Sequence, residues 1–274
     1  MGLRLKLLPF NNVNGNGTAT CDLSSLLGTT IERITLKLGG TAFTKAMLRG
    51  IVIKANGKII YDTSGARRDA CMQYRGIKAN GGFLTLDFSE IRSKTELGQS
   101  LGSLDTTAGI VSLKMEVDIA GATAPTLEAW AECDRPQIDP AQGSTRGLIA
   151  RVHSSTITIG AQGQFSIAVP HFGTAEGGSI FKRIAIFSAK LDALLIKKNG
   201  IVIEENTRAL NEFQQLEYKK EPQPGLYMVD FITDDNQSQA LNTRDAQTME
   251  IMGTFSGAET IVVEVEVLEP IGAF

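Results

Sequence analysis

The sequence predicts an all-β protein made of two tandem, eight-stranded antiparallel β-sandwiches of the jelly-roll type, each with one short helix. The first observation behind this fold class is an internal repeat: Ile53–Ile60 returns as Ile196–Ile203, and Gly82–Phe88 returns as Gly225–Phe231. Both matches stand in the same register along the chain. Solenoid and propeller units span only ~20–50 residues, so a repeat of this much longer period indicates a duplicated domain.

Alternation of apolar and polar residues is the second observation. Ile34, Leu36 and Leu38 alternate with charged or hydroxyl side chains, and residues 113–119 and 263–267 follow the same pattern. A period of two is typical of strands with one buried and one solvated face. Turn residues recur every ~8–12 residues, which is the spacing expected of sandwiches and barrels.

Two asparagine–glycine pairs are the third observation. Asn56-Gly57 and Asn199-Gly200 each stand between two β-branched runs. A type I′ turn needs positive φ at both central residues, which Asn and Gly tolerate. The pattern therefore predicts one tight hairpin in each domain.

The domain boundaries follow from length and composition. A chain of 274 residues has the length of two ordinary domains, each able to bury its own core. We expect the first domain at residues 1–135, the second at 145–274, and a linker at 136–144. Pro136, Pro140 and Gly143 make this stretch a poor strand.

Two segments break the strand pattern at matching places in the repeat, Thr63–Tyr74 and Thr207–Tyr218. Each carries apolar residues at helical spacing: Ala66, Ala70 and Tyr74 in the first, and Leu210, Phe213 and Leu216 in the second. We expect a short helix after each hairpin. Thr207 or Asn206 can cap the second helix by accepting hydrogen bonds from its first backbone N–H groups.

Composition excludes several classes of function. The net charge is −3 and no basic tract exists, so direct binding of nucleic acid is not expected. Cys21, Cys71 and Cys133 are isolated, which predicts buried free thiols and synthesis in a reducing cytoplasm. Met1–Phe10 is apolar and basic but lacks the features of a signal peptide. We expect a strand of the first domain there, or alternatively an arm that contacts membrane or a neighbouring subunit.

The sequence contains few of the residues and motifs that a catalytic site needs. The two histidines, His153 and His171, are too few for a metal cluster in either half, and no nucleophile elbow or phosphate loop occurs. We therefore predict no catalytic, cofactor-binding or metal-ligating residues. Asp87 and Asp230 are related by the repeat, so we expect one structural role, such as bonding a loop backbone, rather than a glycosidase pair.

Other acidic and aromatic residues leave alternatives open. Asp234-Asp235-Asn236 indicates a solvated loop, with structural calcium as the alternative. Trp130 is the single tryptophan, whereas carbohydrate-binding sandwiches usually present a platform of aromatic rings to the sugar. Glu264 and Glu266 suggest a solvated sheet face or a guard against strand addition. Alternatively this row meets basic groups of a neighbouring subunit, for which the candidates are Arg67, Arg68, Lys219 and Lys220.

The order of these segments resembles the major capsid proteins of corticoviruses. The resemblance lies in the opening Leu5–Asn14, in Thr18–Leu23, Ile31–Leu38 and the Ile51–Tyr61 hairpin, and in the closing Leu216–Phe274 with its Tyr227–Phe231 strand. It implies a double jelly roll and a homotrimer with a pseudo-sixfold outline. It also implies an icosahedral shell of neighbouring capsomers and a penton protein, over a lipid membrane with its viral membrane proteins.

Two other classes of function compete with a structural capsid protein of the virion. One is a tandem β-sandwich binding module for glycans or a surface partner. The other is an enzyme on paired jelly rolls, such as a glycan amidase. A stable trimer would favour the capsid protein, since binding modules are often monomers.

Overall fold

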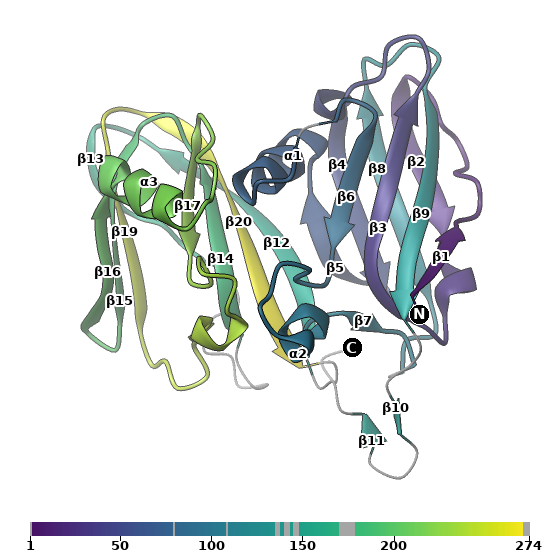
Figure 1. Cartoon of the computed structure of the whole chain (residues 1–274). Coiled ribbons are helices and arrows are strands. Elements are labelled where there is room, and N and C mark those ends of the chain that lie inside the picture. Colours follow the sequence, from purple (N-terminus) through teal and green to yellow (C-terminus); the bar gives the residue numbers. More distant parts are fainter. Residues whose placement is uncertain are drawn as a thin grey trace. The chain divides into compact units, whose positions relative to one another are not determined.

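The computed structural model describes residues 2–78, 80–107, 109–134, 138–139, 143–144, 148–169 and 179–270. These residues form two compact units (Figure 1). Unit 1 comprises Met1–Met72, Lys78–Val152 and Pro270–Phe274, and unit 2 comprises Gln73–Ile77 and His153–Glu269. Most of the predicted linker, residues 136–144, lies outside the described residues, so its role and the predicted boundaries stay predictions.

Unit 1 is a two-layer antiparallel sandwich. One sheet has the order β1-β9-β3-β6, with β7 beside β3, and the strands of the other layer follow the order β5-β4-β8-β2. The strands are β1 (Leu3–Lys6), β2 (Asn16–Asp22), β3 (Thr30–Gly39), β4 (Leu48–Ala55), β5 (Lys58–Thr63), β6 (Phe83–Asp87), β7 (Leu104–Asp105), β8 (Leu113–Ala120) and β9 (Thr126–Asp134). The helices are α1 (Gly65–Tyr74) and α2 (Glu96–Ser100), with short 3-10 turns at Ser24–Leu26 and Lys45–Met47. A two-residue ladder joins β10 (Ile138–Asp139) and β11 (Gly143–Ser144).

Unit 2 repeats this plan. One layer has the order β17-β14-β20-β12, with β18 beside β14, and the other has the order β13-β19-β15-β16. The strands are β12 (Leu148–Ile159), β13 (Gly163–Ser166), β14 (Ile180–Phe187), β15 (Leu191–Lys198), β16 (Ile201–Thr207), β17 (Leu226–Asp230), β18 (Leu241–Asn242), β19 (Met249–Phe255) and β20 (Glu259–Pro270). The helix α3 spans Arg208–Glu217, and a 3-10 turn spans Gln237–Gln239. The predicted all-β class with two tandem antiparallel sandwiches is confirmed.

The predicted alternation determines the core. All four apolar residues of β8 that alternate with polar ones are buried, and the polar ones between them are not. In unit 2 the inward residues of β14, β15, β19 and β20, which include Phe181 and Phe255, form one cluster with Tyr227 of β17. Removing such side chains from water stabilises a sandwich by about 25 cal/mol per Å² of apolar surface.

The two hairpins are equivalent in detail. Each asparagine has positive φ, 49° at Asn56 and 51° at Asn199, and each following glycine also has positive φ, 81° at Gly57 and 79° at Gly200. The strand pairing shifts register at the same repeat position, between Ile53 and Lys54 and between Ile196 and Lys197. The repeat seen in the sequence is therefore a repeat of backbone geometry.

Each hairpin asparagine also ties its turn to a distant loop. The Asn56 Oδ1 atom accepts hydrogen bonds from the backbone N–H groups of Val111 and Ser112. The Asn199 Oδ1 atom accepts the same pair of bonds from Gln247 and Thr248.

The chain between hairpin and loop differs in length between the two units. It runs from Asn56 to Val111 in unit 1 and from Asn199 to Gln247 in unit 2, so the segment before β8 is longer than the one before β19. That longer segment contains α2 and β7, neither of which the sequence predicted.

Both predicted helices form, and each begins at a hydroxyl cap. The Thr207 Oγ1 atom accepts a hydrogen bond from the Leu210 N–H group, and the Ser64 Oγ atom accepts one from Arg67 at 3.3 Å. Helix α3 begins and ends at the repeat counterparts of the first and last residues of α1. The apolar stripe of α3, however, faces solvent.

The N-terminal segment forms a strand of unit 1, which was the first of the two structures expected for Met1–Phe10. β1 pairs antiparallel with β9, from Leu3 opposite Cys133 to Lys6 opposite Trp130. Leu7 and Phe10 are buried beyond its end. The first residues therefore add an edge strand to unit 1.

Replacing either hairpin asparagine tests the equivalence of the two turns. We expect Asn56→Ala to destabilise unit 1 and Asn199→Ala to destabilise unit 2, each by about 1–3 kcal/mol, because two backbone donors lose their acceptor and Ala disfavours positive φ. Differential scanning calorimetry would measure the two transitions. Gln164→Ala, at an exposed position of β13, is the control and should change neither. Equal shifts of both transitions by one variant would contradict the assignment.

Candidate functional site

Unit 2 holds a buried arginine between two carboxylates. Arg183 in β14 lies opposite Asp230 of β17 on one side and Glu266 of β20 on the other. Its Nε atom is 3.2 Å from Asp230 Oδ1, and its Nη1 atom is 2.9 Å from Glu266 Oε2. The Arg183 side chain is 2% exposed. Buried charge is tolerated only where it is paired, so this position restrains the register of both strand pairs.

Residues Gln73–Ile77, which include the last two residues of α1, belong to unit 2 and complete this network. The Tyr74 hydroxyl donates a hydrogen bond to Asp230 Oδ2 at 3.0 Å. Burial, followed by the negative charge of Asp230, raises the pKa of the Tyr74 hydroxyl. Tyr74 therefore stays protonated and acts as a donor to the carboxylate.

Unit 1 has the same three positions with different partners. Arg33 lies opposite Asp87 and Glu132, and a register shift precedes it as one precedes Arg183. Here Arg33 pairs with Glu132 at 2.9 Å and is 26% exposed. Asp87 instead accepts a hydrogen bond from Arg68 of α1 at 2.8 Å. Asp87 and Asp230 thus share a structural position, and both are held by arginine.

Several expectations about charged residues are wrong. Glu264 and Glu266 do not form a solvated face or an edge guard, because β20 lies between β14 and β12, Glu264 is 4% exposed and Glu266 pairs with Arg183. Arg68 and Lys220 are buried and bonded within their own chain, so they do not face a neighbouring subunit. Alternation reports which side chains share a face, but it does not report what covers that face.

The remaining candidate residues are the cysteines, Trp130 and the histidines. All three cysteines are free and buried, as expected, and burial raises the pKa of the Cys21 thiol to about 11. The ammonium groups of Lys6 and Lys37 lie 5.3 and 5.8 Å from the centroid of the Trp130 ring, so the ring is occupied by cation–π contacts. His153 Nε2 lies 3.8 Å from Glu269. His171 lies outside the described residues.

The acidic loop 234–236 is bonded internally. Asp235 Oδ1 accepts a hydrogen bond from the buried Lys220 ammonium at 2.6 Å, and Asp234 Oδ1 accepts one from the Asn236 N–H group. An ammonium already neutralises Asp235, which argues against calcium there. Within the described ranges, no cluster of three or more His, Cys, Asp and Glu side chains is placed to hold a metal ion.

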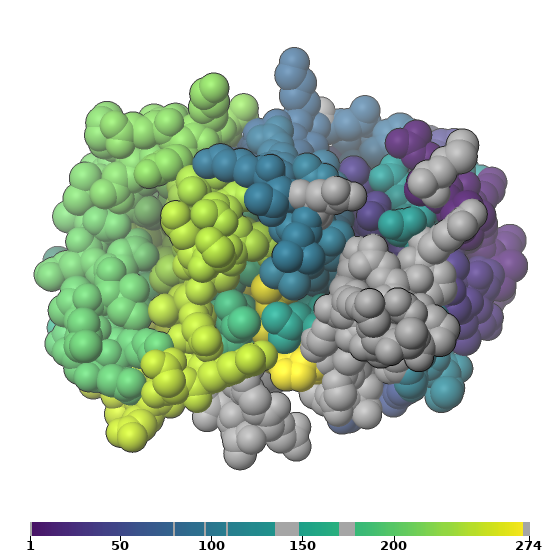
Figure 2. Space-filling model, turned by 60° about the horizontal axis from the view of Figure 1, so that its bottom comes forward, coloured from purple at the N-terminus to yellow at the C-terminus, as the bar shows by residue number. Residues whose placement is uncertain are grey.

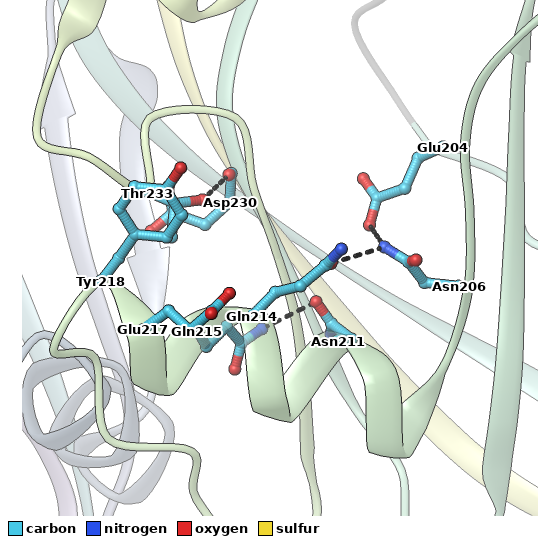
Figure 3. A pocket seen from close by; sticks show the side chains of 9 residues that line it. All are labelled: Glu204, Asn206, Asn211, Gln214, Gln215, Glu217, Tyr218, Asp230 and Thr233. Carbon is cyan, nitrogen blue, oxygen red and sulfur yellow. Dashed lines mark hydrogen bonds between the residues drawn. The ribbon is translucent and has the colours of Figure 1, made fainter.

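A polar pocket of about 290 Å³ opens in unit 2 beside α3 (Figure 3). It is lined by Glu204, Asn206, Asn211, Gln214, Gln215, Glu217, Tyr218, Asp230 and Thr233. Burial raises the pKa of Glu204, while a hydrogen bond from Asn206 lowers it. The lining offers carboxylates and amides, which suit a cation or a polar group.

The repeat explains why this pocket exists. Glu204 and Glu217 are the repeat counterparts of Tyr61 and Tyr74, both of which are fully buried. Two glutamates in place of two tyrosines leave unfilled space beside α3 and line it with negative charge. The pocket was not predicted from the sequence, although a residue-by-residue alignment of the two halves locates these exchanges.

Comparison with known families identifies the chain. Residues 4–134 match the model for the viral coat protein P2 N-terminal domain, and residues 149–271 match that for the P2 C-terminal domain. The chain belongs to the viral coat protein P2 family. It is therefore a structural protein of the virion and not an enzyme, which confirms the predicted function class and disfavours the binding-module alternative.

Solved structures with the same fold agree with the family. The major capsid protein P2 from bacteriophage PM2 is 18% identical, with a TM-score of 0.84 and 98% of each chain covered. The STIV major capsid protein is 12% identical, with a TM-score of 0.74 and 99% of this chain and 97% of that chain covered. The PBCV-1 capsid structure is 12% identical, with a TM-score of 0.61 and coverages of 98% and 94%. No curated protein matches the sequence. Among the described helices of this P2-family chain, none is long and apolar enough to cross a membrane.

The two arginine positions provide a matched test of the buried network. We expect Arg183→Met to destabilise unit 2 by about 3–5 kcal/mol, because it leaves buried carboxylates without a counter-charge. Arg33→Met removes the equivalent, partly exposed arginine and should cost about 0–1 kcal/mol. Urea unfolding monitored by circular dichroism would compare the two. Adding Asp230→Asn and Glu266→Gln to Arg183→Met should restore part of the loss, and similar costs for Arg183→Met and Arg33→Met would contradict the role of burial.

Proposed function

We propose that this P2-family chain forms homotrimeric capsomers with a pseudo-sixfold outline, which tile an icosahedral shell over an internal lipid membrane. The observation that supports this is the repeat: hairpins, helix caps and arginine positions recur in both units. Three copies of a chain with two similar units provide six similar building blocks. A hexagonal lattice needs that number at each position.

The partners follow from this arrangement. They are two further copies of the chain, the neighbouring capsomers, a penton protein, and viral membrane proteins or lipid. Synthesis takes place in the host cytoplasm, as the buried free thiols favour. A net charge of −3 is consistent with a shell that does not contact the genome directly.

The oligomeric state tests the capsomer. We expect analytical ultracentrifugation at micromolar concentration to give three times the chain mass of 29.4 kDa, because obligate interfaces bury more than about 2,000 Å². Electron microscopy of the particles should show capsomers with a six-sided outline. A chain that sediments as a monomer at every concentration would overturn the proposal.

Limited proteolysis tests the domain organisation that we propose, with domains at 1–135 and 145–274 and a linker at 136–144. Endoproteinase Asp-N should cut first before Asp139, because exposed linkers are the preferred sites of nicking and residues 136–144 contain no bond that trypsin cleaves. Mass spectrometry of the first products should give two fragments of similar size. First cuts inside either domain would contradict these boundaries.

A further inference from the structure

The chain contains five asparagine–glycine pairs, and the structure surrounds them differently. They are Asn14-Gly15, Asn16-Gly17, Asn56-Gly57, Asn80-Gly81 and Asn199-Gly200. In such a pair the backbone nitrogen of the glycine can attack the Cγ atom of the asparagine carboxamide, because glycine has no side chain that hinders the approach. Ammonia leaves and a five-membered succinimide forms, which water opens to aspartate or isoaspartate. Asparagine is a chemically labile residue, so each pair is a candidate modification site.

The pair Asn80-Gly81 has the geometry that this reaction needs. It lies in the turn between α1 and β6, where the Phe83 N–H group donates a hydrogen bond to the Asn80 carbonyl at 3.3 Å. The Asn80 Oδ1 atom accepts a hydrogen bond from the Gly82 N–H group at 3.0 Å. This bond keeps the carboxamide folded back toward the backbone of Gly81. It also favours attack, because an N–H donor stabilises the negative charge that develops on the oxygen.

The glycine of this pair is open. Asn80 and Gly81 are both exposed, and a Cβ atom added at Gly81 would have no heavy atom within 4 Å apart from its chain neighbours. Within the part of the chain that the structure describes, the Asn80 Nδ2 atom and the Gly81 N–H group donate no hydrogen bond. In Figure 2, blue parts of the chain, the colour range of this turn, lie at the surface. Water therefore reaches the reacting atoms and the backbone can rotate.

The two hairpin pairs have the opposite geometry. The Oδ1 atoms of Asn56 and Asn199 each accept two hydrogen bonds from a distant loop, so the carboxamide is drawn away from the glycine that follows. The Nδ2 atoms donate to the Gly109 carbonyl at 2.9 Å and to the Asp245 carbonyl at 3.2 Å. With both ends bound, the carboxamide cannot turn toward the glycine nitrogen until the loop opens. A reaction that requires local opening is slowed in proportion to the small open fraction.

The remaining two pairs are restrained by the chain at the start of β2. The Gly15 carbonyl accepts a hydrogen bond from the Ala122 N–H group at 3.1 Å, and a Cβ atom at Gly15 would lie 2.1 Å from the Ala122 carbonyl oxygen. The Asn16 Oδ1 atom accepts a hydrogen bond from the Gly121 N–H group at 2.9 Å. Neither pair combines a folded-back carboxamide with an open glycine.

We propose that Asn80 is the site at which the folded chain is modified by deamidation, and that the hydrogen bonds of Asn56 and Asn199 protect the two hairpins from the same reaction. The Gly81 nitrogen forms a bond to the Asn80 Cγ atom as the bond from Cγ to the amide nitrogen breaks. Hydrolysis of the succinimide then leaves a carboxylate. Overall one water is consumed and one ammonia is released, so the reaction needs no enzyme and no other reactant.

The product suits the first environment and not the second. At Asn80 the carboxylate replaces an NH2 group that has no partner among the described residues, and an oxygen still accepts the hydrogen bond from Gly82. At the hairpins a carboxylate oxygen would replace the NH2 donor that faces the Gly109 or Asp245 carbonyl. Two acceptors would then face each other without a hydrogen bond, which is costly. The chain can therefore gain a negative charge at Asn80 and keep its fold.

Peptide mapping by mass spectrometry tests the order of the five sites. The full chain is incubated at mildly alkaline pH, and the modified fraction of each pair is followed with time. We expect the rate at Asn80 to exceed the rates at Asn56 and Asn199 by at least about 10-fold, since the hairpin loops must open first. In urea the five rates should converge. Hairpin rates in the folded chain that match the rate at Asn80 would overturn the proposal, and so would the same unequal rates in urea, because sequence alone would then set the order.

Two kinds of variant test the site itself. Gly81→Ala adds a methyl group that has room and hinders the attacking nitrogen, so the rate at Asn80 should fall at least about 10-fold while the other four rates stay unchanged. Asn80→Asp imitates one product and should leave the melting temperature in differential scanning calorimetry unchanged. Asn56→Asp and Asn199→Asp should each lower it. An unchanged rate in Gly81→Ala, or a lower melting temperature in Asn80→Asp alone, would contradict the proposal.

Discussion

A guanidinium enclosed by protein is the constraint on which unit 2 depends. Arg183 is removed from water, so the strands on both sides of β14 must each present a carboxylate at its level. That requirement favours the register of both strand pairs, because a slip of one residue would turn a carboxylate to the other face. Tyr74 then satisfies the remaining oxygen of Asp230. Unit 1 has the same strand order around the partly exposed Arg33, so in unit 2 the buried charge reinforces an order that both units share.

The duplicated domain kept its framework and changed its surfaces. The hairpin asparagines, the helix caps and the arginine positions recur in both units, whereas two buried tyrosines of the first half correspond to pocket glutamates in the second, and polar or small residues of α1 correspond to exposed apolar residues of α3. Framework positions carry backbone strain and buried polar groups, where most exchanges are costly. Surface positions carry neither. Two copies of one sandwich could therefore acquire different partners without losing a common shape.

Local rules explain what could be predicted from the sequence. Asn-Gly between β-branched runs predicted both hairpins, and a period of two predicted the buried residues of β3, β8 and β20. The errors arise where tertiary structure decides. Glu266 and Lys220 look like surface residues until Arg183 and Asp235 are placed beside them. Periodicity located the stripe of α3 but gave no sign of its direction, because hydrogen bonds from Asn211 and Gln215 on the other face hold the helix.

The chain's intrinsic probes are unevenly distributed between the two units. Trp130, the single tryptophan, and all three cysteines belong to unit 1. The cysteines are buried and the Trp130 ring lies against two ammonium groups. Indole fluorescence and thiol labelling therefore report the opening of the first sandwich and are silent about the second. The untagged protein thus has an optical and a chemical reporter for one half, and the disassembly of a shell could be followed one kind of unit at a time.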